Sequence, residues 1–110
     1  MVEPAFTLNG GSAQDPLKLA IPAPGEYLLT TRVDVTSPVD AATIWCRLVK
    51  DNDDGVGPGF TSNPLAARAR TVVIGESRII VNREIRVECA GTSGVALNVS
   101  KIELLAKRLP

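Results

Sequence analysis

The sequence predicts an all-β chain that folds as a sandwich or barrel of antiparallel strands. Apolar and polar residues alternate with a period of two through most of the chain, which is typical of strands with one buried face. Glycine, proline and asparagine mark the breaks between these runs at near-regular intervals. The chain has 110 residues, a length suited to one compact domain over residues 1–110.

The first third of the chain contains three expected strands. Residues 5–8 are a weak candidate and residues 17–21 a short one, and we expect residues 1–16 to form an extended N-terminal arm. The clearest strand covers residues 26–36, where residues suited to a core alternate with polar or charged ones. Its two faces consist of Leu29, Thr31, Val33 and Val35, and of Thr30, Arg32, Asp34 and Thr36.

The middle of the chain shows the same alternation in shorter pieces. Its expected strands are 43–50, 71–74, 77–81 and 84–89. The longest break is 51–64, which is rich in glycine and proline, and a short break at 75–77 separates two of the runs.

The C-terminal segment, residues 95–109, fits either a strand or a helix. As a strand it places Val95, Leu97 and Val99 on one face, with a shift in register near Ser100. Its leucine, alanine, lysine and glutamate residues favour a helix by propensity. We expect the strand, because a lone β-sandwich usually closes with a long strand beside the first.

The composition excludes several classes of function. The chain has no histidine, which removes the commonest general base, the catalytic triads that depend on it and most zinc sites. Its 12 basic residues balance 12 acidic ones, whereas nucleic-acid binders and polybasic membrane binders need a basic excess. No apolar run approaches the roughly 20 residues that cross a bilayer. We therefore expect no nucleic-acid partner and no membrane insertion.

The charges are unevenly distributed along the chain. Residues 1–64 carry four basic and eight acidic side chains, whereas residues 65–110 carry eight basic and four acidic ones. Such an asymmetry can orient subunits in an assembly. The simpler explanation, which we favour, is that neighbouring strands from the two halves cancel each other's charge across a sheet.

Cys46 and Cys89 are candidates for one disulfide. Both are expected at inward-facing positions of different strands, so a bridge across the core is favoured over two buried thiols. In the chain-entropy model such a bridge, closing a loop of about 44 residues, contributes on the order of 4 kcal/mol. It implies an oxidising setting, outside the cell or in a released particle.

The densest acidic cluster consists of Asp51, Asp53 and Asp54, next to Gly55. Alternating carboxylates in a glycine-bearing loop resemble the start of a calcium loop. The twelfth position of that pattern is Ser62 rather than glutamate, and such loops also occur at strand ends for turn reasons alone. We favour a solvated turn, keep calcium as the alternative and expect no other cofactor.

Trp45 is expected on the face opposite Cys46, and therefore on the outer side of a sheet. There it could contact a sugar or lie in a subunit interface, where aromatic residues are enriched, and Tyr27 could accompany it. No catalytic constellation stands out, because the carboxylates are spread over the expected strands and no histidine can activate a cysteine. We therefore expect a protein that is not an enzyme.

Short patterns over residues 20–106 carry a resemblance to known domains. They are the glycine-x-tyrosine opening at 25–27, the strand around Cys46 and the strand that ends in Cys89. Together they resemble small bacterial and phage-encoded β-sandwich domains of jelly-roll type, broadly similar to the C1q and tumour-necrosis-factor-like fold. The resemblance implies an antiparallel jelly roll of about eight strands and a homotrimer that serves in capsid decoration, tail fibres, stalks or adhesion.

These observations favour a structural or assembly module of a virion or surface appendage. It would act through homo-oligomeric contacts, with a trimer favoured, and through other virion or surface proteins. The alternative is a carbohydrate-binding module with a glycan ligand. Residues 1–4 lack the basic and apolar regions of a signal peptide, so we expect none, and we expect a virion, extracellular or cell-surface location.

Overall fold

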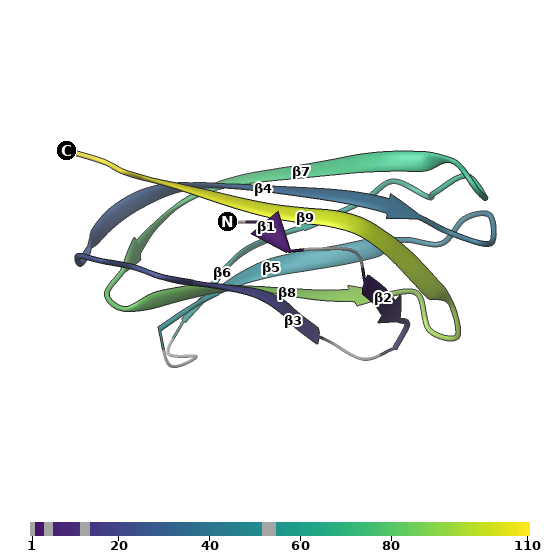
Figure 1. Ribbon diagram of the computed structural model, residues 1–110, viewed down its shortest axis with the longest axis horizontal. Coiled ribbons are helices and arrows are strands. Elements are labelled where there is room, and N and C mark those ends of the chain that lie inside the picture. Colours follow the sequence, from purple (N-terminus) through teal and green to yellow (C-terminus); the bar gives the residue numbers. More distant parts are fainter. Residues whose placement is uncertain (1, 4–5, 12–13, 52–54) are drawn as a thin grey trace.

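In the part of the chain that the structure describes, nine strands form two layers that pack face to face (Figure 1). The computed structural model describes residues 2–3, 6–11, 14–51 and 55–110. No helix in this part of the chain is long and apolar enough to span a membrane. The strands are β1 (Val2–Glu3), β2 (Phe6–Asn9), β3 (Gln14–Ala20), β4 (Gly25–Thr36), β5 (Ile44–Lys50), β6 (Gly55–Thr61), β7 (Arg70–Val81), β8 (Glu84–Gly91) and β9 (Ala96–Arg108).

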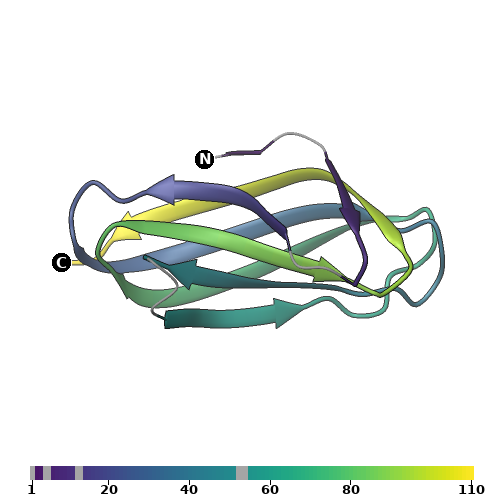
Figure 2. The ribbon, with the colours of Figure 1, turned by 90° about the horizontal axis from the view of Figure 1, so that it is seen from below.

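The strand order is that of a jelly roll. Sheet A has the order β1-β9-β4-β7, and β2 pairs with β9 along the same edge as β1. Sheet B has the order β3-β8-β5-β6 and lies in front of sheet A in Figure 2. All these pairs are antiparallel, and from β2 to β9 the chain changes layer at every connection except that from β5 to β6. The expected antiparallel β-sandwich of jelly-roll type, with about eight strands, is confirmed.

The core lies between the two layers. The alternation expected along residues 26–36 is observed, since Leu29, Val33 and Val35 of β4 are fully buried. Aliphatic side chains from both sheets fill the interior, and the largest of them are Leu8, Leu29, Ile44, Leu48, Ile85, Leu97, Ile102 and Leu104. Strands in which apolar residues alternate with polar ones are enough to build a core of this kind, so it needs few aromatic residues.

The C-terminal segment is a strand, as expected. β9 pairs with β4 on one side and with β1 and β2 on the other. The register against β4 shifts between Asp34 and Val35, which leaves Ser100 as the extra residue of a bulge. Pairing on both sides overrides the helical propensity of this segment.

Two stretches expected as breaks belong to strands. β7 continues through residues 75–77 and pairs with β4 at every position without a shift in register. β6 lies inside the expected break 51–64 and pairs with β5. Glycine and proline weaken a strand, but β6 is at the edge of sheet B, where proline is tolerated.

The described residues of the N-terminal segment 1–16, which is expected as an extended arm, pair with strands of the sandwich. β1 and β2 pair with β9, and Leu8 of β2 is fully buried in the core. β3 begins at Gln14 and pairs with β8. In the described part of this segment, backbone pairing and the burial of Leu8 therefore tie the chain to both sheets.

Candidate functional site

Cys46 and Cys89 form a disulfide that joins neighbouring strands of one sheet. Cys46 on β5 lies directly opposite Cys89 on β8, with their Cα atoms 4.1 Å apart. Both side chains are buried in the core. The expected Cys46–Cys89 disulfide is confirmed, but the expectation that it crosses the core is wrong, because inward-facing positions do not reveal that β5 and β8 are adjacent. The bond ties two strands of sheet B together rather than the two layers.

The Asp51 carboxylate closes the turn between β7 and β8. Its Oδ1 atom accepts hydrogen bonds from the backbone N–H groups of Asn82, Arg83 and Glu84, at 3.1, 2.6 and 3.3 Å. Burial raises the pKa of this carboxyl, but the three N–H groups and the charge of Arg83 outweigh it and hold the pKa below its ordinary value of 3.8. Asp51 therefore has a structural role as an ionised acceptor.

Asp51, which would be the first ligand of the calcium site kept as an alternative, is engaged in these hydrogen bonds instead. The Asp51 oxygens already serve backbone donors, whereas Asp53 and Asp54 lie outside the described residues. Within the described residues, no three acidic or cysteine side chains gather in a way that could hold a metal ion.

A second buried carboxylate, Asp34, lies on the outer face of sheet A. Its Oδ2 atom accepts a hydrogen bond of 2.6 Å from Nη2 of Arg70, and its Oδ1 atom lies 3.5 Å from Nε of Arg32. The hydrogen bond from Arg70 is the main reason that the pKa of Asp34 is lowered, against the opposing effect of burial. Asp34 and Arg70 come from the acidic and basic halves of the chain, so this pair is the cross-sheet cancellation that the charge pattern predicts.

Trp45, Arg47 and Glu88 form a group on the outer face of sheet B, which we call the Trp45 surface. The guanidinium carbon of Arg47 lies 5.4 Å from the centre of the Trp45 ring, within the range of a cation–π contact. Nε and Nη2 of Arg47 lie 2.7 and 2.6 Å from one Glu88 oxygen. The ring also lies close to Gly59, since a Cβ atom there would be 3.1 Å from the indole nitrogen. Trp45 therefore faces outward as expected, but it is half-buried between Arg47 and the β6 backbone.

Tyr27 does not accompany Trp45, and its assignment to a ligand or interface surface is wrong. It lies on the inner face of β4, 4% exposed, on the same side as Leu29. Its hydroxyl donates a hydrogen bond of 2.6 Å to the backbone carbonyl of Ala23. The alternation along β4 therefore places Tyr27 in the core.

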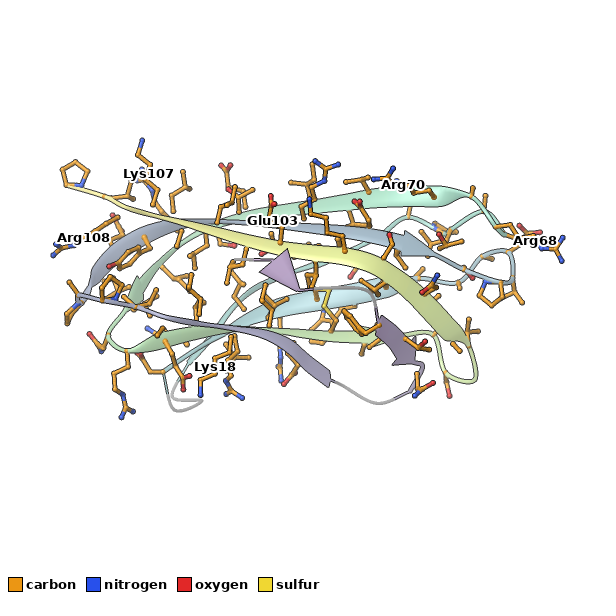
Figure 3. All side chains as sticks on the ribbon, in the orientation of Figure 1. Lys18, Arg68, Arg70, Glu103, Lys107 and Arg108 are labelled. Carbon is orange, nitrogen blue, oxygen red and sulfur yellow. A yellow bond between two sulfur atoms is a disulfide. The ribbon has the colours of Figure 1, made fainter. Side chains whose placement is uncertain are left out.

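Most of the large exposed aliphatic side chains of the described residues lie on the outer face of sheet A. Ile74, Ile80 and Val72 of β7 are 63%, 59% and 39% exposed, and Leu105 of β9 is 53% exposed. We call Val72, Ile74 and Ile80 the β7 aliphatic row. β7 is the edge strand of sheet A, and Arg70 at its start lies on the outer side of this sheet, as Lys107 of β9 does (Figure 3).

A pocket of about 250 Å³ lies beside the first part of β7. It is lined by Thr61 at the end of β6, by residues 62–65 that follow it, and by residues 71–74 of β7. All these lining residues are uncharged, and they offer hydroxyl, amide and aliphatic groups. The pocket lies between the end of β6 with the residues that follow it and the first part of β7, and the later residues of β7 do not line it.

The β7 aliphatic row does not follow from the sequence analysis, because the sequence predicts two short strands, 71–74 and 77–81, in place of one long edge strand. The signal was present in the composition of that stretch. Aliphatic residues occur on both of its faces, as they do in a strand that is covered on both sides. They are Val72, Ile74 and Ile80 on the outer face, and Val73, Ile79 and Val81 on the inner face.

The two-layer strand order and the aliphatic core define a jelly-roll β-sandwich domain. No model of a known protein family and no curated protein sequence matches this chain. Its fold is similar to a chain in the structure of the infectious bursal disease virus Gx strain, with a TM-score of 0.61 and 10% identity. That likeness covers 96% of this chain, which spans only 30% of the viral chain.

A second solved structure with a similar fold is the carbohydrate-binding module CBM6cm-2 of Cellvibrio mixtus lichenase 5A, in complex with cellotriose. The TM-score is 0.50 at 14% identity, over 88% of this chain and 72% of the module. At such identities the two likenesses show the fold alone.

Proposed function

We propose that this protein is a non-enzymatic structural module that assembles with copies of itself in a virion or a surface appendage. The observation that carries the proposal is the β7 aliphatic row, which stands exposed on an edge strand. Exposed aliphatic side chains and open strand edges both favour contact with another chain. The lack of histidine supports the non-enzymatic part of the proposal.

Two observations support a location in a virion or outside the cell. The fold is similar to a chain in a virus structure, and the Cys46–Cys89 disulfide is typical of proteins in oxidising settings. A trimer is the assembly that the resemblance to the C1q and tumour-necrosis-factor-like fold implies. Other virion or surface proteins are its further partners in this proposal.

Light scattering on the purified chain tests the proposed self-assembly. We expect a stable assembly whose mass is a whole multiple of the 11.6 kDa chain. The physical reason is that contact with a second copy removes exposed aliphatic surface from water. A mass of one chain at every concentration up to the limit of solubility would contradict the proposal.

A carbohydrate-binding module is the second candidate function, and the Trp45 surface favours it. An outward indole beside the Arg47–Glu88 pair offers a sugar both an apolar face and hydrogen-bonding groups. The likeness of the fold to a module bound to cellotriose supports the same interpretation. The close approach of Arg47 and Gly59 limits how much of the ring a sugar could reach.

A glycan array that includes cellotriose tests the second candidate. If Trp45 carries the binding, W45A should lose it, whereas W45F should keep much of it because a flat ring remains. Binding that W45A does not change would remove Trp45 from the site. A monomer that binds a glycan would favour this function over self-assembly.

A further inference from the structure

We propose that two copies of this chain join edge to edge through β7, antiparallel about a two-fold axis at Ser77. The inference deepens the proposed self-assembly and rests on it. The contact joins the A sheets of the two copies into one continuous sheet. By itself it makes a dimer, and together with a three-fold contact it makes a larger assembly.

β7 is the edge strand that lacks a proline, a bulge and an interruption. Natural edge strands are commonly short, interrupted, bulged or broken by proline. β3 contains Pro16 and β6 contains Pro58, and each has a shift in register against its neighbour. The edge along β9 is divided between β1 and β2. β7 by contrast has 12 residues, no proline and an unbroken register with β4.

Both faces of β7 are incompletely covered within one copy. The outer face carries the β7 aliphatic row, and Ile74 is 63% exposed. On the inner face, alternate residues from Thr71 to Ile79 are only half-buried, whereas the inward residues of the neighbouring β4 are buried. A partner strand beside β7 would cover side chains on both faces and pair the backbone groups that an edge leaves open.

Charge complementarity selects the register. With the axis at Ser77, Glu76 of one copy lies opposite Arg78 of the other, and this pair occurs twice. The same register places Ile74 opposite Ile80, also twice. Shifting the axis by one residue places Glu76 opposite Glu76 or Arg78 opposite Arg78, which is repulsive. Among the described residues, neither Glu76 nor Arg78 has an ion-pair partner within its own copy.

One other register also pairs opposite charges, with the axis at Val73 and Arg70 opposite Glu76. That contact would be centred on Val73, one of the β7 residues that line the pocket together with residues 61–65. The axis at Ser77 aligns residues 73–81 of the two copies and centres the contact beyond the pocket, since only Val73 and Ile74 among these residues line it. The geometry therefore favours Ser77 as the centre.

Reversal of single charges on β7 tests both the contact and its register. R78E places two glutamates opposite each other at each pair, and E76R places two arginines there. Each variant should raise the dissociation constant of the two-fold contact by roughly tenfold or more. The double variant E76R/R78E restores opposite charges and should regain the association of the unmodified chain. Sedimentation velocity over a concentration series measures all four proteins.

Lys107→Glu is the matched control. Lys107 is exposed on β9 and lies in the same cross-strand row as Arg78, with Leu28 of β4 between them. K107E replaces a basic by an acidic side chain on the same face, as R78E does, but away from the edge. It should therefore associate as the unmodified chain does. Melting curves of every variant show that the charge changes leave the fold intact.

The outcomes distinguish a failure of the β7 contact from a failure of the proposed self-assembly. If the unmodified chain assembles and the single reversals behave like K107E, the β7 contact is overturned and self-assembly stands. If E76R disrupts the assembly and R78E does not, the register at Ser77 is overturned in favour of Val73. If the unmodified chain is always monomeric, the proposed function fails and the β7 contact fails with it. Disruption by both single variants with rescue by the double variant supports the contact.

Discussion

Reduction of the Cys46–Cys89 disulfide is expected to lower the free energy of unfolding by about 4 kcal/mol in the chain-entropy model. The bond links residues 43 positions apart in the sequence, so it removes much of the freedom of the unfolded chain. For a domain of this size, such a loss corresponds to a fall in melting temperature of roughly 20 °C. Calorimetry of the oxidised and reduced protein measures both quantities.

The variant C46A/C89A separates the bond from other effects of the reductant. It has no bridge, so its melting temperature should be low and should not respond to reductant. Because both cysteines are buried, the variant also loses core contacts and should melt slightly below the reduced protein. An equal melting temperature for the oxidised and reduced protein would show that the bond does not stabilise the fold.

Replacement of Asp51 by alanine is expected to lower the free energy of unfolding by about 3 kcal/mol. The change leaves the N–H groups of Asn82, Arg83 and Glu84 without their charged acceptor at the turn between β7 and β8. Asp51 also has a φ of 55°, a left-handed conformation that aspartate and asparagine tolerate better than alanine does. Urea unfolding of the two proteins measures the difference.

The Asp51→Asn variant is the conservative control. D51N keeps the side-chain shape, one acceptor oxygen and the tolerance for a left-handed backbone, so its loss should be about half that of D51A. A D51A protein as stable as the unmodified chain would show that the turn needs no side-chain acceptor.

Acidification should reduce the contribution of Asp51 to the stability of the fold. The pKa values of Asp51 and Asp34 are both lowered in the fold. Each ionised carboxyl therefore stabilises the protein at pH values above 3.8, the ordinary pKa of aspartate. This contribution is lost as the pH falls below that value and passes through the lower pKa of the folded state. The difference in stability between the unmodified chain and D51N should therefore shrink as the pH falls below 3.8. E26Q, which removes an exposed carboxylate of β4, is the control.

Much of the strand pattern could be predicted from local alternation. The faces of 26–36 and 43–50 are as expected, because a period of two determines which side chains share one side of a strand. The outward position of Trp45 follows from the same rule. The burial of Tyr27 also obeys it, since Tyr27 is in phase with Leu29, and the expectation of an exposed tyrosine disregarded that phase.

The two expected breaks that belong to strands depend on pairing between distant segments. β6 formed in a glycine- and proline-rich stretch because β5 supplies its hydrogen bonds, and β7 passed through Gly75 because β4 pairs with it throughout. The ring of Phe60 fills the space over Gly75, where a Cβ atom would overlap Cδ1 of that ring. Glycine there reflects a close contact from the other sheet rather than a turn.

By itself, the sequence determined that this protein is an antiparallel β-sandwich, which side of most strands is buried, and that both cysteines face inward. These are local properties, because alternation along a strand sets them residue by residue. Only the tertiary structure decided which strands are neighbours. It placed Cys89 beside Cys46 in one sheet, directed Asp51 to the turn after β7, and left β7 at an open edge. Apart from β5 and β6, the neighbouring strands described here are far apart in the sequence, so the packing of the two layers, and no local pattern, selects them.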